Sequence, residues 1–478
     1  MRKIKFLALL VLGGLVASCE SDFLEPVPSS GITADSYYND EQELLTGIIG
    51  MYDALQGVND NNLRNNHAIQ YEYYLTEMRS DNTRTKSQEG EAAQFEFYTV
   101  QATNGIVADY YASFYNVIFR ANIILANLDV VSNADTKKAY EGEAKFIRAY
   151  AYFNLVRLFG DIPKIDRIIQ PLETDIQFTR VATSEIYDFI ISDLQTAVSG
   201  LDNTYKTRAS KAAAQAMLAK VYLTTGGNYA EAQLLCEDIM GQGFELLDNF
   251  NDVFYNERNN EIIFAIGYES ALASDSQNFS AEWMNGVGRT SGVNYVTNDV
   301  ITALEASGGD RTQYSYRVDP SQTTQNQVTK YLPNGEDGGD DGKTFVNDAT
   351  LAGNDWIVLR YADVLLMHVE AIMAGAAETS VASARASFQE VQDRAFPDTA
   401  PNTKAIITKD ELLLERRVEL AFENHRFFDL VRFGKAEQIL GDFSAANGLN
   451  FTSSALLLPI PQGEINLGKG LMGQNPNY

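Results

Sequence analysis

The stretch EGEAKFIRAYAYFNLVRLFGDIP, residues 141–163, has the pattern of a long helix. Apolar side chains recur every three or four residues and share one helical face: Phe146, Ala149, Tyr150, Phe153 and Val156. The charged residues Glu141, Lys145 and Arg148 fall on another face. Gly160 and Pro163 then end the helix, because neither residue continues a helix readily. The stretch therefore predicts an amphipathic helix that packs against other helices.

A second helical unit follows in RASKAAAQAMLAKVYLTTGGNYAEAQLLCEDIM, residues 208–240. Small side chains at Ala212, Ala216 and Ala219 permit the close approach of a neighbouring helix. A double-glycine turn precedes the second helical run, and the whole unit resembles a tetratricopeptide hairpin. Residues 361–395 repeat this plan less regularly. We therefore predict a mainly α-helical scaffold.

Polar segments separate the helical stretches. They cover residues 59–70, 79–109, 270–298 and 318–355. Long polar segments between packed helices are usually surface loops, and such loops often carry function. The run PNGEDGGDDGK, residues 333–343, clusters carboxylates, but the alternating ligand spacing of an EF-hand calcium loop is missing. We therefore expect no cofactor, and a structural calcium ion has no ligand motif to support it.

The amino terminus resembles a bacterial lipoprotein signal. Three positive charges within the first five residues precede an apolar run that is shorter than the roughly 20 residues needed to span a bilayer. Small residues then lead to Cys19, the position at which a lipobox cysteine receives its lipid. We therefore expect residues 1–18 to be a signal peptide and residues 19–478 to form one domain anchored through Cys19. An ordinary signal peptide that contains a cysteine is the alternative.

The chain is strongly acidic. Its formal net charge is −27, and removal of three positive charges with the signal would give −30. A field of this sign repels nucleic acid and favours neutral or cationic ligands, so we expect no nucleic acid partner. Besides Cys19 the only cysteine is Cys236, so a lipidated chain can form no internal disulfide.

No motif in the sequence supports catalysis. The three histidines form no HExxH zinc motif, and GxSxG, P-loop and dinucleotide GxGxxG patterns are absent. The 64 acidic residues offer many carboxylate pairs, but no linear spacing identifies the pair that a glycosidase needs. His368 lies among apolar residues, which is typical of a structural histidine. The charged run at residues 416–432 permits ion pairs one helical turn apart, and we interpret it as structural.

Five stretches resemble landmarks of the SusD/RagB family of outer-membrane lipoproteins, in the usual order. They are DFLEPVP behind Cys19, AKFIRAYAYFNLVRLFGDIP, WIVLRYADVLLMHVEA, ERRVELAFENHRFFDLVRFGKA and the final LLLPIPQGEINLGKGLMGQNPNY. The resemblance implies a SusD-like helical fold with tetratricopeptide-like hairpins on one side and long ligand-binding loops on the other. It also implies a non-catalytic lipoprotein of the cell surface that delivers oligosaccharide or polysaccharide to a SusC-like TonB-dependent transporter. The acidic ESD motif is similar to signals that send such lipoproteins to the outer face.

Sugar binding needs an aromatic plane against the apolar ring face and polar groups at the hydroxyls. Trp283 lies in a polar loop, where the family often places a stacking aromatic, and is our first choice for this platform. Tyr295 follows close behind it. Trp356 precedes a helical stretch, and we expect it in the core.

Polar candidates come from the amino-terminal half. The motif EMRSDNTRTK brings Arg79, Asp81 and Asn82 together, in a neighbourhood from which relatives contribute ligand contacts. Ligand binding and simple capping remain equal alternatives for Asp81 and Asn82, because both residue types favour turns and helix starts. Asn104 is a further candidate by the same positional resemblance.

The acidic charge favours a neutral glycan, such as a glucan or a fructan. RagB-like peptide capture is one alternative, and it would depend more on backbone pairing than on an exposed tryptophan. A helical scaffold protein of the transporter complex is the other. Such a scaffold would copurify with a barrel and bind neither sugar nor peptide.

Overall fold

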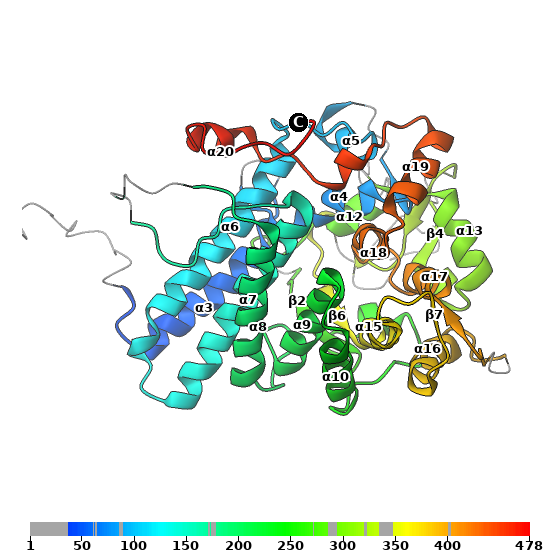
Figure 1. Cartoon of the computed structure of the whole chain (residues 1–478), viewed down its shortest axis with the longest axis horizontal. Helices are drawn as coiled ribbons and strands as arrows, with labels where there is room; N and C mark the ends of the chain where they lie inside the picture. The colour runs from blue at the N-terminus through cyan, green and yellow to red at the C-terminus, as the bar shows by residue number, and fades with distance from the viewer. Residues whose placement is uncertain are drawn as a thin grey trace, which may run out of the picture.

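The structure is a computed structural model that describes residues 37–60, 62, 65–85, 89–170, 173, 178–270, 272–284, 294–319, 323–333, 348–399 and 403–478. These residues form a mainly helical body (Figure 1). The expected signal peptide, Cys19 and most of the acidic run at residues 333–343 lie outside the described residues. Within the described part, no helix is long and apolar enough to cross a membrane.

A series of long helices forms the scaffold. In order they are α3 (Glu41–Gln56), α6 (Gly105–Ala126), α7 (Ala134–Phe159), α8 (Thr183–Gly200), α9 (Lys211–Thr225), α10 (Tyr229–Met240), α15 (Tyr361–Met373) and α16 (Ala382–Ala395). Each helix packs against the next one in this series, as Figure 1 shows. The predicted helical scaffold is therefore confirmed.

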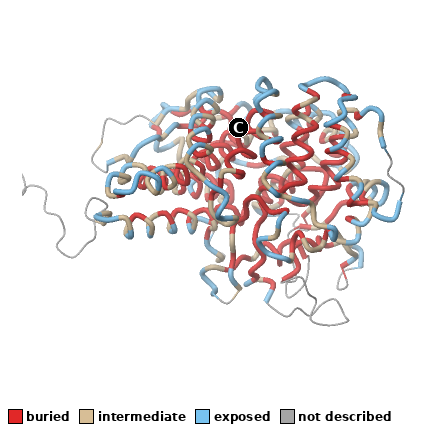
Figure 2. Tube along the Cα trace, turned by 90° about the horizontal axis from the view of Figure 1, so that it is seen from below, coloured by how far each residue is buried: buried red, intermediate tan, exposed pale blue. Residues whose placement is uncertain are grey.

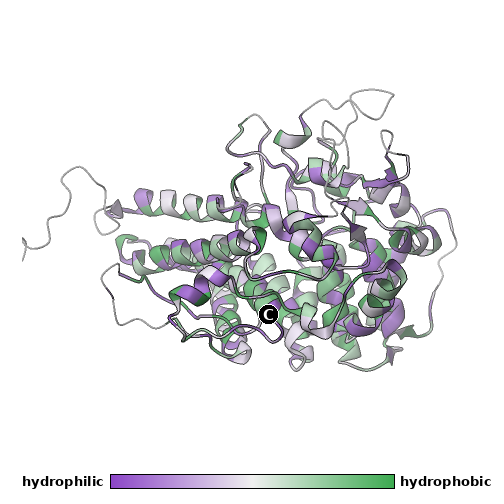
Figure 3. Ribbon diagram, turned by 90° about the horizontal axis from the view of Figure 1, so that it is seen from above, coloured by the Kyte–Doolittle hydropathy of each residue, from purple (hydrophilic) through white to green (hydrophobic). Residues whose placement is uncertain are grey.

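Helix α7 is more deeply buried than its sequence pattern predicts. Arg148, on the predicted polar face, is buried and donates from Nε and Nη2 to both carboxylate oxygens of Asp193 on α8, at 2.8 and 2.9 Å. The charged face is covered because α8 packs against it. The helix ends where predicted, at Gly160, whose φ of 70° suits glycine. Figures 2 and 3 show the buried and hydrophobic positions gathered inside the helical body.

The hairpin of α9 and α10 forms as predicted. Ala212, Ala216 and Ala219 have no exposed surface, which allows the neighbouring helices to approach closely. Gly226 ends α9 in the left-handed conformation with φ of 66°, as helix-terminal glycines often do. Cys236 is buried within α10 as a free thiol.

Short strands and helices occupy the segments predicted as polar loops. The strands β1 (Thr83–Arg84), β3 (Tyr295–Val296), β5 (Asn326–Val328) and β4 (Tyr316–Val318) form an antiparallel sheet in the order β1-β3-β5-β4. Two strand pairs join β2 (Ile262–Ile266) to β6 (Trp356–Arg360) and β7 (Glu378–Thr379) to β8 (Ile407–Thr408). The prediction of loop structure throughout 79–109 and 270–298 is wrong where α5 (Gly90–Glu96), α6 and α12 (Phe279–Trp283) lie.

The remaining helices gather mainly around the carboxy-terminal half. The longer ones are α13 (Asn298–Ser307), α17 (Lys409–Glu419), α18 (Arg426–Arg432), α19 (Ala436–Asn447) and α20 (Gln462–Leu467). Shorter turns are η2 (Ala68–Tyr71), α4 (Glu72–Leu75), η3 (Glu77–Arg79), η4 (Leu128–Val130), α11 (Asp252–Tyr255), α14 (Arg311–Ser315), η6 (Ala349–Leu351) and η7 (Ser453–Leu456). A capping box between Thr408 and Glu411 starts α17, because each side chain accepts a backbone N–H from the other residue.

The charged run at residues 416–432 is a structural network, as predicted, but most of its partners come from other elements. Glu419 has no exposed surface and accepts charge-assisted hydrogen bonds from Arg311, Arg360 and Arg394. Arg432 and Asp429, at 2.8 Å, do form the expected pair within one turn. The network thus joins α17 to β6, α14 and α16, which a helical pattern alone does not reveal.

Candidate functional site

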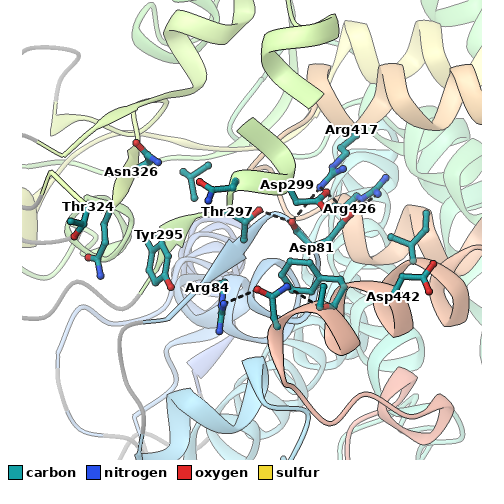
Figure 4. Close-up of a pocket in the computed structure, with 17 residues that line it drawn as sticks. Asp81, Arg84, Tyr295, Thr297, Asp299, Thr324, Asn326, Arg417, Arg426 and Asp442 are labelled. Carbon is teal, nitrogen blue, oxygen red and sulfur yellow. Dashed lines mark hydrogen bonds and ion pairs between the residues drawn. The ribbon is translucent and has the colours of Figure 1, made fainter. Parts of the chain in front are cut away.

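A surface hollow of about 720 Å³ lies where the four-stranded sheet meets α13, α17, α18 and α19 (Figure 4). We call it the main hollow. Its lining residues are Asp81, Arg84, Tyr295, Val296, Thr297, Asn298, Asp299, Thr324, Gln325, Asn326, Arg417, Arg426, Ile439, Asp442, Phe443, Ala446 and Asn447. A volume of this size is typical of a small-molecule or oligosaccharide site.

Ion pairs build the floor of the main hollow around Asp81. Arg426 donates from Nε and Nη2 to the two Asp81 carboxylate oxygens, both at 2.8 Å. Arg417 reaches Asp81 Oδ2 and Asp299 Oδ1, both at 2.9 Å. Burial by itself would raise the pKa of Asp81, but the two guanidinium groups hold it below its usual range. The floor is therefore an ion-paired arrangement that holds Asp81 as a carboxylate (Figure 4).

The sheet supplies a wall with one aromatic ring. Tyr295 on β3 is half-buried and pairs in register with Arg84 on β1. Arg84 is held by Glu96, whose Oε1 accepts from Nε at 2.6 Å, and by Asn447 Oδ1 at 2.9 Å. Figure 4 shows Tyr295 on one side of the Asp81 cluster and Asp442 on the other. The ring of Tyr295 is thus placed to contact a ligand in the main hollow.

The lining is electrically balanced in a chain of strongly negative charge. Three arginines and three aspartates line the main hollow, while the whole chain carries a formal charge of −27. The arginine side chains at 417 and 426 are mostly buried and paired with aspartates, so they offer little unpaired positive charge. Such a lining presents hydrogen-bonding groups without net charge, which suits uncharged polyhydroxyl compounds.

The structure corrects the first choice for the aromatic platform. Trp283 has no exposed surface and packs among Tyr73, Tyr331 and Phe422, with ring centroids 5.6, 5.7 and 6.1 Å away. The polar composition of its neighbourhood predicted exposure, but the aromatic cluster covers the ring. Trp283 is a core residue and does not present a face to a ligand, whereas Trp356 is buried as predicted.

Three polar candidates have structural roles and do not line the main hollow. Arg79 is buried, donates to the backbone oxygens of Leu75 and Ala455, and lies 4.2 Å above the Phe427 ring. Asn104 caps α6, because its Oδ1 accepts the Val107 N–H at 3.1 Å. Both side chains are buried, and neither is among the residues that line the main hollow.

Asn82 supports the floor from behind. Its Oδ1 accepts from Arg417 Nε at 3.0 Å, and its Nδ2 donates to Glu77 Oε2 at 3.3 Å. Burial raises the pKa of Glu77 to about 7. Asn82 is therefore a positioning residue for Arg417, and it is not among the residues that line the main hollow.

Several lining residues escaped the sequence analysis. Arg417 and Arg426 were interpreted as purely structural, yet they also form the floor of the main hollow. The spacing of the two arginines in the sequence does not reveal this role, because their partner Asp81 lies more than 300 positions away in the chain. Arg84 stood inside the quoted EMRSDNTRTK motif and could have been added from that neighbourhood.

His368 has the structural role that its sequence neighbourhood predicts. His368 is buried, and its Nδ1 lies 2.8 Å from Ser387 Oγ, which confirms its structural role. Among the described residues, no group of three or more histidine, cysteine, aspartate or glutamate side chains is arranged to hold a metal ion.

Comparisons with known proteins agree with this architecture. A family model described as "Starch-binding associating with outer membrane" matches residues 22–223, and one described as "SusD family" matches residues 304–478. A SusD-like protein of Formosa agariphila is 26% identical, with 100% of each chain covered. A solved laminarin-binding SusD-like protein is 26% identical with a TM-score of 0.76, covering 92% of this chain and 100% of that one.

A further solved structure shares the fold at lower identity. It is surface glycan-binding protein A from Bacteroides thetaiotaomicron in complex with laminarihexaose, at 19% identity and a TM-score of 0.73, with 92% and 100% of the two chains covered. SusD family members are binding proteins without catalytic activity. The two family models together match most of the sequence, residues 22–223 and 304–478, and the chain belongs to the SusD/RagB family.

Proposed function

We propose that this protein binds a neutral oligosaccharide or polysaccharide in the main hollow and delivers it to a SusC-like TonB-dependent transporter. The observation that carries the proposal is the charge-balanced lining with the half-buried Tyr295 ring beside it. A sugar ring can stack its apolar face on the tyrosine while its hydroxyls meet Asn298, Asn326 and Asp442. The family to which the chain belongs supports glycan binding at the outer membrane.

The structure changes the reason to prefer glycan over peptide as the cargo. An exposed Trp283 was the sequence-based reason to prefer glycan, and its burial removes that reason. The balanced polar lining and the sugar-binding relatives support glycan instead. A panel of ligands must therefore include peptides.

Calorimetric titration of the lipid-free protein, residues 20–478, tests the proposal. Laminarin and laminarihexaose are the first probes because relatives bind them; starch, inulin and a mixed peptide pool complete the panel. We expect saturable binding to one neutral glycan, weakened about tenfold in Tyr295→Ala through loss of a contact worth roughly 1.4 kcal/mol. The matched control is Tyr316→Ala, a tyrosine of the same sheet that does not line the main hollow.

Two results would contradict this function. Binding of peptides alone would show that the cargo is peptide and not glycan. Wild-type glycan affinity in Tyr295→Ala would show that the glycan binds outside the main hollow. Binding of no ligand, together with copurification of a barrel, would favour the scaffold alternative.

The same proposal includes a lipid anchor on Cys19 and exposure on the cell surface. The lipobox-like residues before Cys19 and the acidic residues behind it support this placement. Full-length protein should label with radioactive palmitate and resist extraction without detergent. Cys19→Ser should abolish the label and release the protein, whereas Cys236→Ser, at the buried free cysteine, should leave the label intact.

A further inference from the structure

A second hollow, of about 380 Å³, lies between α13, α16 and α17. We call it the second hollow. Its lining includes Phe396 at the end of α16, the amides of Gln389 and Gln392, and the carboxylates of Asp393 and Glu411. As in the main hollow, a half-buried aromatic ring lies beside several hydrogen-bonding groups, the combination that suits a sugar.

The aromatic ring of the second hollow is held in place. A Cβ atom added at Gly309 would lie 2.8 Å from Phe396 Cε1 and 2.1 Å from the backbone oxygen of Ala395. The Asp310 N–H also donates to that oxygen at 2.9 Å. The turn after α13 therefore packs tightly against the end of α16. The half-buried Phe396 ring is fixed before any ligand arrives, which limits the entropy lost on binding.

The polar groups of the second hollow are also organised. Gln389 Nε2 donates to Asp393 Oδ1 at 2.7 Å, and Lys404 Nζ lies 2.6 Å from Glu411 Oε1. Both pairs are partly exposed to solvent. Carboxylate and amide oxygens retain acceptor capacity beyond these contacts, so hydroxyl groups can still bond to them.

One pair of helices connects the two hollows. The amino-terminal residue Asp299 of α13 lines the main hollow, whereas Ala306 near its other end lines the second. Likewise Arg417 on α17 lines the main hollow and Leu414, three residues earlier, lines the second. Figure 1 shows α13 and α17 side by side, with α19 toward one end and α16 toward the other.

Short side chains line an exposed face of α13 between the hollows. Asp299, Thr302 and Ala306 follow the three- and four-residue spacing of one helical face. All three are exposed, and their side chains are short. From Asp299 to Ala306 the helix rises about 10 Å. A flexible glycan chain of several units can bridge that distance.

We infer that the second hollow is an additional glycan subsite, so that one polysaccharide chain lies along α13 and α17 and occupies both hollows. The inference rests on the proposed function, because the main hollow provides the first contact. Joint occupation raises affinity for long chains through effective concentration and leaves the affinity for short oligosaccharides unchanged. The second subsite therefore selects for polymer length.

Binding of laminarin and of laminaribiose, whose two sugar rings are too few to span the roughly 10 Å between the hollows, tests the inference in the lipid-free protein. Phe396→Ala removes the ring, and Ala306→Arg places a large side chain on the exposed face of α13. We expect both variants to bind laminaribiose like the wild type and to bind laminarin about tenfold or more weakly. Ala126→Arg is the matched control, an exposed alanine in the last turn of α6.

The outcomes separate this inference from the proposed function. Wild-type laminarin affinity in both variants, with loss in Tyr295→Ala, would overturn the second subsite and leave the main site standing. Equal loss of affinity for laminaribiose and laminarin would also overturn it, because the second hollow would then be part of a single site. Failure of the wild type to bind either sugar would exclude laminarin as the cargo and overturn the inference of a laminarin chain in both hollows, while starch and inulin still test the main hollow. If Phe396→Ala does not fold, the laminarin affinity of Ala306→Arg provides the test, because position 306 is exposed and the substitution should leave the fold intact.

Discussion

Asp81 shows how one residue can serve both structure and site. It is 2% exposed and paired with two arginines from α17 and α18, while its carboxylate lines the main hollow. From the sequence alone, ligand binding and capping are equal alternatives for Asp81. The structure gives a different role, because Asp81 fixes the arginines that form the floor.

We therefore expect Asp81→Ala to lower the free energy of unfolding by about 3–5 kcal/mol, since it leaves buried Arg426 without its partner. Chemical denaturation measures this change. Asp442→Ala is the control, because Asp442 lines the same hollow but is exposed, and its removal should change stability by less than about 1 kcal/mol. Equal effects of both substitutions would contradict the structural role of Asp81.

Glu72 should make the stability of the protein depend on pH. Burial raises the pKa of Glu72 to about 7 from an ordinary value of 4.5. Between these values the folded state holds a proton that the unfolded state releases, so stability falls as pH rises through this window. Glu72→Gln should abolish this loss. At pH 8 we expect the variant to be more stable than the wild type by on the order of 2 kcal/mol, with the difference shrinking toward pH 5. Urea denaturation at both pH values measures it, and a difference that does not change with pH would contradict the assignment.

At the scale of elements, the crossing of α7 and α8 depends on close backbone approach. A Cβ at Gly200 would lie 2.6 Å from the backbone oxygen of Lys138, and one at Gly142 would lie 2.9 Å from Leu201 Cγ. Backbone atoms cannot yield as a flexible side chain can. The amphipathic pattern of α7 predicts a partner helix but says nothing of this distance.

Gly200→Ala should therefore destabilise the protein by about 1–3 kcal/mol through overpacking, although alanine is the better helix former. The matched control is Gly441→Ala in α19, where nothing lies within 4 Å of the added Cβ. That substitution should stabilise by about 0.5–1 kcal/mol. Thermal unfolding of both variants measures the two shifts, and shifts of the same sign would refute this account of the crossing.

At the scale of the whole molecule, the buried network of ion pairs around Glu419 connects the helical scaffold to the main hollow. Glu419 contacts arginines from β6, α14 and α16, and its helix α17 also carries Arg417 to the main hollow. One large apolar cluster includes residues of β6, α16 and α17. We infer that scaffold and site unfold together.

Calorimetry should then record one transition for the wild type. Glu419→Ala removes a carboxylate that three buried arginines share. These arginines keep Glu415, Glu261 and Glu423 as partners, but the buried network is left with one excess positive charge. We therefore expect the free energy of unfolding to fall by about 3–5 kcal/mol. Glu437→Ala, at an exposed glutamate of α19, should change it by less than about 0.5 kcal/mol. Two separate transitions in the wild type would show that the scaffold and the site are independent units.

The sequence by itself determined the helical scaffold, its glycine stops and its family, because periodic apolar residues and local turn chemistry are contained in short segments. It also identified the neighbourhoods of Asp81 and Tyr295. Only the tertiary structure decided that Trp283 is buried, that Arg79, Asn82 and Asn104 serve structure, and that Arg417 and Arg426 meet Asp81. The physical reason is that exposure and ion pairing depend on residues far apart in the chain, which hydrophobic spacing along one helix does not encode.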